Sequence, residues 1–151
     1  MIEKGFVLKL LKEIVGLEKI ITDLAINSKN IITTEIFKKI RTRIEEKDNK
    51  ILILKNIINF MKSLSSEQSK LFKLYFVYGA SQKILEKEFK DISQRTIYRK
   101  IDKIKKKAEE YLLWKSYMQR EAKCQGFTGT KKEELGLVLM MNLVCGIHLK
   151  N

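Results

Sequence analysis

Proline is absent from the 151-residue chain, and glycine occurs only seven times. Since these two residues interrupt helices more than any others, the sequence sets few obstacles to long helices. Lysine, isoleucine, leucine and glutamate are the commonest residues. The composition therefore predicts an all-α protein. A chain of this length has room for one domain, or for one small domain with a helical extension.

Cysteine and histidine are also scarce, with two cysteines, Cys124 and Cys145, and one histidine, His148. Two cysteines are too few for a disulfide framework, so reduced thiols are expected. These three residues lack the paired spacing of metal ligands, and we expect no metal and no other cofactor. The sequence has no glycine-rich phosphate loop, and adjacent glutamates such as Glu109 and Glu110 point in different directions on a helix. We therefore expect no enzyme activity and no small-molecule substrate.

No run approaches the ~20 apolar residues that a membrane-spanning helix needs. The first residues mix charges with apolar side chains, unlike a signal peptide, so a cytoplasmic location is expected and membrane binding is the least favoured function. The most apolar run, LGLVLMMNLVCGIHL, occupies residues 135–149. Two interpretations remain open for it: a helix that packs over the core, or a tail of uncertain order.

The formal net charge is +13. A charge of this sign and size attracts polyanions, namely DNA, RNA or an anionic membrane surface. An AT-rich genome, which favours lysine codons, offers a second explanation for the excess. The positions of the charges must decide between them.

Two amphipathic segments fill the first part of the chain. Apolar residues recur at heptad spacing within residues 5–26, at Val7, Leu10, Ile14, Leu17, Ile21 and Leu24. After a polar break at 27–30, a second stripe starts near Thr33 or Thr34 and comprises Ile36, Ile40, Ile44, Lys47, Ile51, Leu54, Ile58 and Met61. Asp48-Asn49-Lys50 is a candidate interruption. Such stripes predict a helical hairpin, with a homodimer through 7–24 and 36–61 as the open alternative.

Helix boundaries are marked more clearly after residue 63. Ser65 and Gln68 have the spacing of a capping box, which predicts a helix from Ser66 to Tyr78 that Gly79 ends. Ser81 then opens a short helix over 82–89, a turn follows at 90–92, and Ser93 caps a long helix over 94–118. We divide the chain into a hairpin at 1–63, a second helical domain at 64–120 and an apolar tail at 121–151.

Residues 81–107 have the parts of a helix-turn-helix: a short helix, a tight turn and a capped second helix. On the second helix one stripe is apolar, consisting of Ile97, Ile101, Ile104 and Ala108. The opposite side carries Arg95, Arg99, Asp102 and Lys106, with Tyr98 beside them. Residues 83–107 hold ten lysines and arginines against four acidic residues, a net +6. Genomic lysine bias does not explain that placement.

The first two turns of a recognition helix read bases, and the remainder contacts phosphate. Arginine can bind guanine through two hydrogen bonds, and glutamine can bind adenine in the same way. The candidate base contacts are Gln94, Arg95, Tyr98 and Arg99. The candidate phosphate contacts are Ser93, Lys83, Lys103, Lys105, Lys106 and Lys107.

A family resemblance adds to this interpretation. Residues 64–112 resemble region 4 of bacterial sigma factors, and more closely the small phage and mobile-element regulators of the ArpU and RinA kind. The shared pattern is an aromatic-plus-glycine step, here Tyr75 to Gly79, followed by the start of the reading helix, here Ser93-Gln94-Arg95-Thr96-Ile97-Tyr98-Arg99. The chain departs from that pattern at Leu85-Glu86, where a small residue is usual, and at Phe89, which lies one place further from Ser93 than usual.

The resemblance implies a sequence-specific transcriptional regulator that binds double-stranded DNA and contacts RNA polymerase. The alternative is a helical interaction module with only non-specific affinity for nucleic acid. In that case 81–107 is an ordinary helix pair with a solvated basic face. Tyr98 is then a packing residue. For Asp102 we expect an ion pair with Arg99 or Lys106, and base reading is its less favoured alternative. Tyr111, Leu112 and Trp114 are expected in the core or in a dimer contact.

Overall fold

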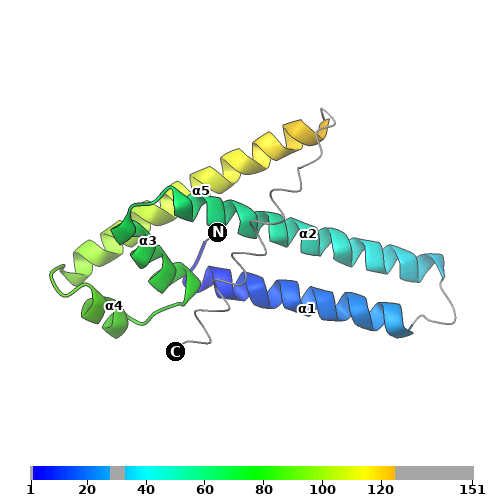
Figure 1. Ribbon diagram of the computed structural model, residues 1–151, viewed down its shortest axis with the longest axis horizontal. Helices are drawn as coiled ribbons and strands as arrows, with labels where there is room; N and C mark the ends of the chain where they lie inside the picture. The colour runs from blue at the N-terminus through cyan, green and yellow to red at the C-terminus, as the bar shows by residue number, and fades with distance from the viewer. Residues whose placement is uncertain (1, 28–32, 125–151) are drawn as a thin grey trace. The chain divides into compact units, whose positions relative to one another are not determined.

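The computed structural model describes residues 2–27 and 33–124, and every regular element in these ranges is helical (Figure 1). The elements are α1 (Phe6–Asn27), α2 (Thr34–Lys62), α3 (Ser66–Phe72), the π-helical segment η1 (Lys73–Val77), α4 (Gln82–Glu88) and α5 (Gln94–Cys124). The all-α prediction is confirmed. The predictions for 135–149, with Cys145 and His148, lie outside the described residues.

Residues up to Glu109 form one compact unit, and those from Glu110 onward form a second. We describe each by itself. The domain boundaries predicted from the sequence at 63/64 and 120/121 stay predictions.

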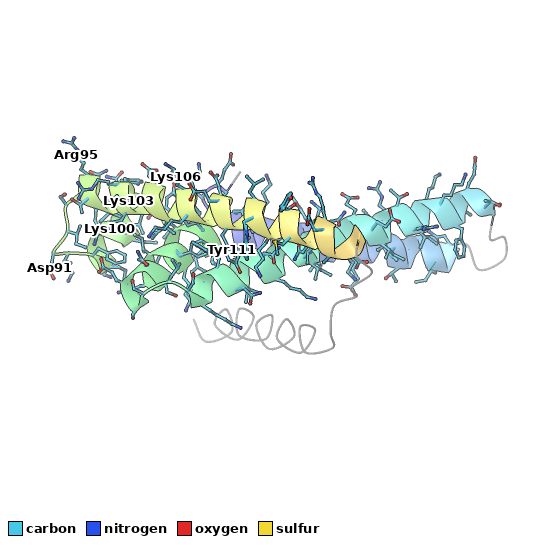
Figure 2. All side chains as sticks on the ribbon, turned by 90° about the horizontal axis from the view of Figure 1, so that it is seen from above. Asp91, Arg95, Lys100, Lys103, Lys106 and Tyr111 are labelled. Carbon is cyan, nitrogen blue, oxygen red and sulfur yellow. The ribbon has the colours of Figure 1, made fainter. Side chains whose placement is uncertain are left out.

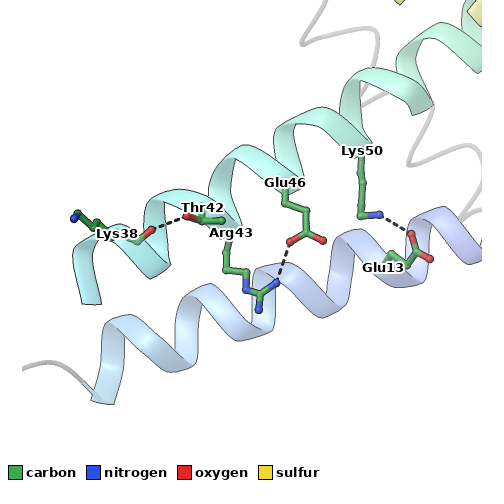
Figure 3. A network of polar contacts seen from close by, with 6 residues as sticks. All are labelled: Glu13, Lys38, Thr42, Arg43, Glu46 and Lys50. Carbon is green, nitrogen blue, oxygen red and sulfur yellow. Dashed lines mark hydrogen bonds and ion pairs between the residues drawn. The ribbon is translucent and has the colours of Figure 1, made fainter. Parts of the chain in front are cut away.

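Helices α1 and α2 pack along each other. The first four residues of the α1 stripe, Val7, Leu10, Ile14 and Leu17, are buried as predicted, whereas Ile21 and Leu24 are half-buried. Helix α2 runs without a break through Asp48-Asn49-Lys50, so the candidate interruption is wrong. These residues are polar but compatible with a helix, and Lys50 Nζ donates to Glu13 Oε2 of α1 at 2.9 Å (Figure 3).

The second half of α2 is buried on two sides. Leu54 and Ile58 of the predicted stripe are buried, and so are Ile57 and Phe60, which lie outside it. Phe60 meets Phe72 of α3 with ring centroids 5.9 Å apart, and Phe72 meets Phe76 of η1 at 5.0 Å. Because α2 packs against α3 as well as α1, its apolar face is wider there than a single heptad stripe.

The predicted capping box is present at the start of α3, where the side chain of each of Ser65 and Gln68 bonds the backbone N–H of the other. The predicted helix over 66–78 changes character at Lys73, where π-helical bonding begins. Tyr78 N–H donates to the carbonyl of Lys73, five residues back, at 2.9 Å. Gly79 follows with a φ of 63°, a conformation that favours glycine.

Gly79 also touches the start of α1. Gly5 has a φ of 69°, and its N–H donates to the carbonyl of Tyr75 at 3.0 Å. A Cβ on Gly79 would lie 3.4 Å from the Cα of Gly5, so the two glycines let the backbones approach closely. This contact holds the end of η1 against the first turn of α1.

Helix α4 ends at Glu88, one residue before the predicted end, and Leu85 and Phe89 are buried. Ser81 has the extended backbone of an N-cap, but its side chain makes no capping hydrogen bond. Helix α5 extends to Cys124, six residues beyond the predicted end at Met118. No glycine or proline lies between Gln94 and Cys124, so nothing in the sequence stops the helix earlier.

The second unit is described only as the last part of α5. The rings of Tyr111 and Trp114 lie 6.2 Å apart, and Lys115 Nζ lies over both. Trp114 is 53% exposed and Leu113 is 75% exposed, so a core position is wrong for Trp114. Tyr111 and Leu112 are half-buried. The dimer contact predicted for these residues stays a prediction.

Candidate nucleic-acid interface

The start of α5 is fixed by the predicted serine cap. Ser93 Oγ accepts from the backbone N–H of Thr96 at 3.3 Å and lies 2.9 Å from Thr96 Oγ1. This pairing satisfies one of the free N–H groups of the first turn. Ser93 was a candidate phosphate contact; it is exposed, and its hydroxyl is already used in the cap.

The two faces of α5 separate as the sequence predicts. Ile97, Ile101, Ile104 and Ala108 are at most 2% exposed. Arg95, Arg99, Asp102 and Lys106 on the other side are all exposed. Arg95 projects from the start of the helix, and Lys106 lies three turns further along (Figure 2). The helix therefore presents guanidinium and ammonium groups to solvent while its apolar stripe is packed.

Tyr98 lies at the edge of this exposed face. It is half-buried, and its ring meets the ring of Tyr75 in η1 edge to face, with centroids 6.5 Å apart. Burial raises the pKa of the Tyr75 hydroxyl, and the nearby Tyr98 and Asp102 raise it further. The contact gives Tyr98 a packing role, whether or not it touches a base.

The ten candidate contacts do not form a single row. At 100° per residue, Arg95, Arg99 and Lys106 share the outer face of α5, while Gln94, Tyr98 and Lys105 lie toward one flank and Lys103 and Lys107 toward the other. Gln94, Lys103 and Lys107 are exposed, and Lys105 is half-buried. Lys83 is exposed and is the one candidate that lies on α4.

Asp102 does not behave as predicted. Among the described residues it forms no ion pair with Arg99 or Lys106. Its carboxylate is instead close enough to the Tyr75 hydroxyl to affect that group's pKa. The i, i+3 spacing from Arg99 and the i, i+4 spacing to Lys106 permit such a pair but do not enforce it between exposed side chains.

Helix α3 is tied to both helices of the candidate helix-turn-helix by residues that sequence reasoning missed. Lys70 Nζ lies 3.1 Å from Glu88 Oε2 of α4 and 5.3 Å from the Phe89 ring centroid. Lys100 Nζ of α5 lies 2.6 Å from Glu67 Oε1 of α3. Neither pair has a helical spacing in the sequence, so no local pattern could have identified them.

Comparison of the chain with protein-family models, with curated proteins and with solved structures gives no match. The resemblance to sigma-factor region 4 therefore depends on the sequence pattern alone. Within residues 2–27 and 33–124, no helix is both long and apolar enough to cross a membrane. In the same part of the chain, no three histidine, cysteine, aspartate or glutamate side chains gather where they could hold a metal ion.

Proposed function

We propose that this protein is a sequence-specific DNA-binding regulator in which α4, the turn over 89–93 and the start of α5 form a helix-turn-helix. The observation that carries the proposal is the outer face of α5. Arg95, Arg99 and Lys106 are exposed opposite a fully packed apolar stripe, and the two arginines lie in the first two turns of a capped helix. Helices α1 and α2 pack against η1 and α3, the two elements that precede this module in the chain.

The proposed docking places the first two turns of α5 in the major groove. Arg95 and Arg99 are one turn apart and read bases, because a guanidinium can donate two hydrogen bonds to guanine. Residues 94–107 span about 20 Å at 1.5 Å per residue, so a straight helix leaves the groove near its lysines. Lys106 and the nearby Lys103, Lys105 and Lys107 then contact phosphate. Gln94 is the next candidate reader.

Charge density supports the same region. Residues 83–107 have a net charge of +6, and two of their acidic side chains already have partners within the protein. Glu88 forms an ion pair with Lys70, and Glu86 accepts a hydrogen bond from Gln82. The basic side chains on the outer face of α5 have no such partner in the described residues, and they remain available to phosphate. The resemblance to sigma-factor region 4 further suggests RNA polymerase as a second partner.

The deciding experiment starts with selection of bound duplexes from random DNA. Affinity is then measured for the selected site and for a random duplex across a salt series. If four to six basic residues of 83–107 contact phosphate, log K should fall against log salt with a slope of roughly −4 to −5. A slope near zero, or no binding to duplex DNA at low salt, would contradict the proposal.

A helical interaction module is the second candidate function, and one observation favours it. Phe37 is 65% exposed and Ile44 is 42% exposed, and because they are seven residues apart they share one face of α2. A second copy of the chain could cover them. If it does, Phe37→Ser with Ile44→Ser should convert a dimer to a monomer in sedimentation, while Val15→Ser, an exposed position on α1, should not.

A further inference from the structure

A shallow hollow of about 280 Å³ lies between the start of α3 and the flank of α5, within the first compact unit. Polar and charged side chains line it, namely Ser65, Glu67, Gln68, Lys100, Lys103 and Lys107. Leu71 and Ile104 complete the lining with apolar side chains. The hollow therefore combines three cations and one carboxylate around a small space.

The three lysines form one row because residues at i, i+3 and i+7 share a side of a helix. This row lies roughly 90° around α5 from the outer face that carries Arg95 and Arg99, at 100° per residue. Figure 2 labels Lys100 and Lys103 beside α5 and Arg95 at its start. A helix whose outer face meets the floor of the major groove turns a flank of this kind toward the sugar-phosphate backbone.

Glu67 of α3 lines the same hollow and forms an ion pair with one lysine of this row. Its Oε1 lies 2.6 Å from Lys100 Nζ, and the two side chains are 52% and 40% exposed. An ion pair this exposed is only a weak constraint, because water and salt compete for both charges. A phosphate oxygen has the same acceptor chemistry as the carboxylate and would also meet Lys103 and Lys107.

We propose that the hollow binds one backbone phosphate of DNA, and that Glu67 is a built-in competitor which this phosphate displaces from Lys100. The inference rests on the proposed DNA-binding function, adds Lys100 to its phosphate contacts, and makes Glu67 a competitor for that contact. Glu67 lowers the affinity for every duplex, since a phosphate contact carries no sequence information. It thereby limits non-specific binding by a strongly basic protein.

The test compares Glu67→Gln with Lys100→Ala on the selected and the random duplex. We expect Glu67→Gln to raise affinity for both duplexes by about two- to fivefold, and Lys100→Ala to lower both by a similar factor. The salt slope should steepen by up to about one in Glu67→Gln and flatten by about one in Lys100→Ala. Glu86→Gln is the matched control: it removes the same charge from an exposed residue of α4 outside the hollow, and should change affinity by less than about twofold.

A purely structural pair, which only ties α5 to α3, gives a different result. In that case both variants shift affinity in the same direction and lower the melting temperature together, and the proposal is overturned. It is equally overturned if Glu67→Gln and Glu86→Gln behave alike. Lys100→Arg, which keeps the charge, should retain wild-type affinity. If Lys100→Ala fails to fold, Lys100→Gln, which removes the charge but keeps a long side chain, takes its place.

Failure of the proposed DNA-binding function gives a result of its own, which the wild-type protein shows. A wild-type protein that binds no duplex at low salt removes DNA binding itself. A wild-type protein that binds, with a site preference that Arg99→Ala weakens, retains the proposed function even where the variants at Glu67 and Lys100 show no effect.

Discussion

Tyr98 of α5 meets Tyr75 of η1 edge to face, with ring centroids 6.5 Å apart and ring planes at 90°. Tyr75 in turn contacts Phe76, which lies against Phe72 and through it Phe60. A series of ring contacts therefore extends from α2 to the proposed recognition helix. Together with the buried stripe of α5, it restricts the rotation of this helix about its own axis, and with it the direction in which the outer face points.

Substitutions at Tyr98 separate its packing role from a contact with DNA. Tyr98→Ala should cost about 0.5–1.5 kcal/mol for the aromatic pair, in addition to the apolar area it exposes. Tyr98→Phe keeps the ring, so we expect wild-type stability and affinity for the selected site within about twofold. Denaturant unfolding and DNA titration measure the two effects. A larger loss of affinity for Tyr98→Phe would show that the hydroxyl bonds to DNA.

Arg95, Arg99 and Lys106 should differ in what they do for binding, although all three lie on the outer face of α5. Arg95→Ala or Arg99→Ala should cost about 1–3 kcal/mol on the selected site and much less on random DNA. Lys106→Ala should weaken both alike and reduce the salt slope by about one. Stability should hardly change, since alanine suits exposed helical positions.

Equal losses on both duplexes for the arginine variants would mean that these residues only hold phosphate. Sequence preference would then have to come from Gln94 or Tyr98, and the same pair of titrations on Gln94→Ala identifies which.

The contact between α1 and α2 should depend unevenly on the residues of the α1 stripe. Leu17 is buried, and Leu17→Ala should cost about 2–5 kcal/mol of unfolding free energy. Leu24 has the same position in the heptad but is half-buried, so Leu24→Ala should cost clearly less. Denaturant unfolding gives both values. Equal losses, or no loss at Leu17, would show that the stripe is not packed as the structure indicates.

Acid should weaken the pairing of the same two helices through Glu13. The hydrogen bond from Lys50 holds the pKa of this carboxyl below its ordinary value of 4.5, against the opposing effect of desolvation. The stabilisation is therefore present above pH 4.5 and is lost as the pH falls through the lowered pKa. Because both side chains are partly exposed, its size is about 0.2–1 kcal/mol.

Glu13→Gln tests this prediction. The variant should be less stable than the wild type at pH 7, and the difference should disappear in acid. Glu45→Gln is the control, since Glu45 pairs with Arg41 on its own helix and joins no second element. A difference between wild type and Glu13→Gln that persists below the lowered pKa would indicate lost packing rather than a lost ion pair.

Much of the fold could be predicted because it is local. The caps at Ser65 and Ser93 and the buried stripe of α5 each depend on residues within a few turns of one another. The π-helical segment could not be predicted in this way, because it ends where Gly79 docks against Gly5, which lies 74 positions earlier in the chain. The burial of Ile57 and Phe60 likewise depends on a second neighbour of α2 rather than on the spacing within it.

The candidate interface likewise has features that the sequence predicts and features that depend on tertiary packing. The exposed arginines of α5 follow from helical periodicity, and so does the side of the helix they occupy. The pair between Glu67 and Lys100 joins residues 33 positions apart, and only tertiary packing brings them together. The same packing buries part of the Tyr98 side chain. Helical periodicity alone places this residue beside Arg95 and Arg99, the proposed base-reading residues.

The hydrogen bond from the backbone N–H of Ile2 to Glu109 Oε1, at 3.2 Å, imposes an order on assembly. It joins positions 107 residues apart, and the Ile2 side chain is buried with it. On the ribosome, α1 and α2 can pair as soon as both have emerged, since only six residues of sequence lie between them. The backbone N–H of Ile2 cannot form this bond until residue 109 has been synthesised. A nascent chain stalled before α5 should thus hold a formed helix pair without this bond, and completion of the compact unit should coincide with the arrival of the proposed recognition helix.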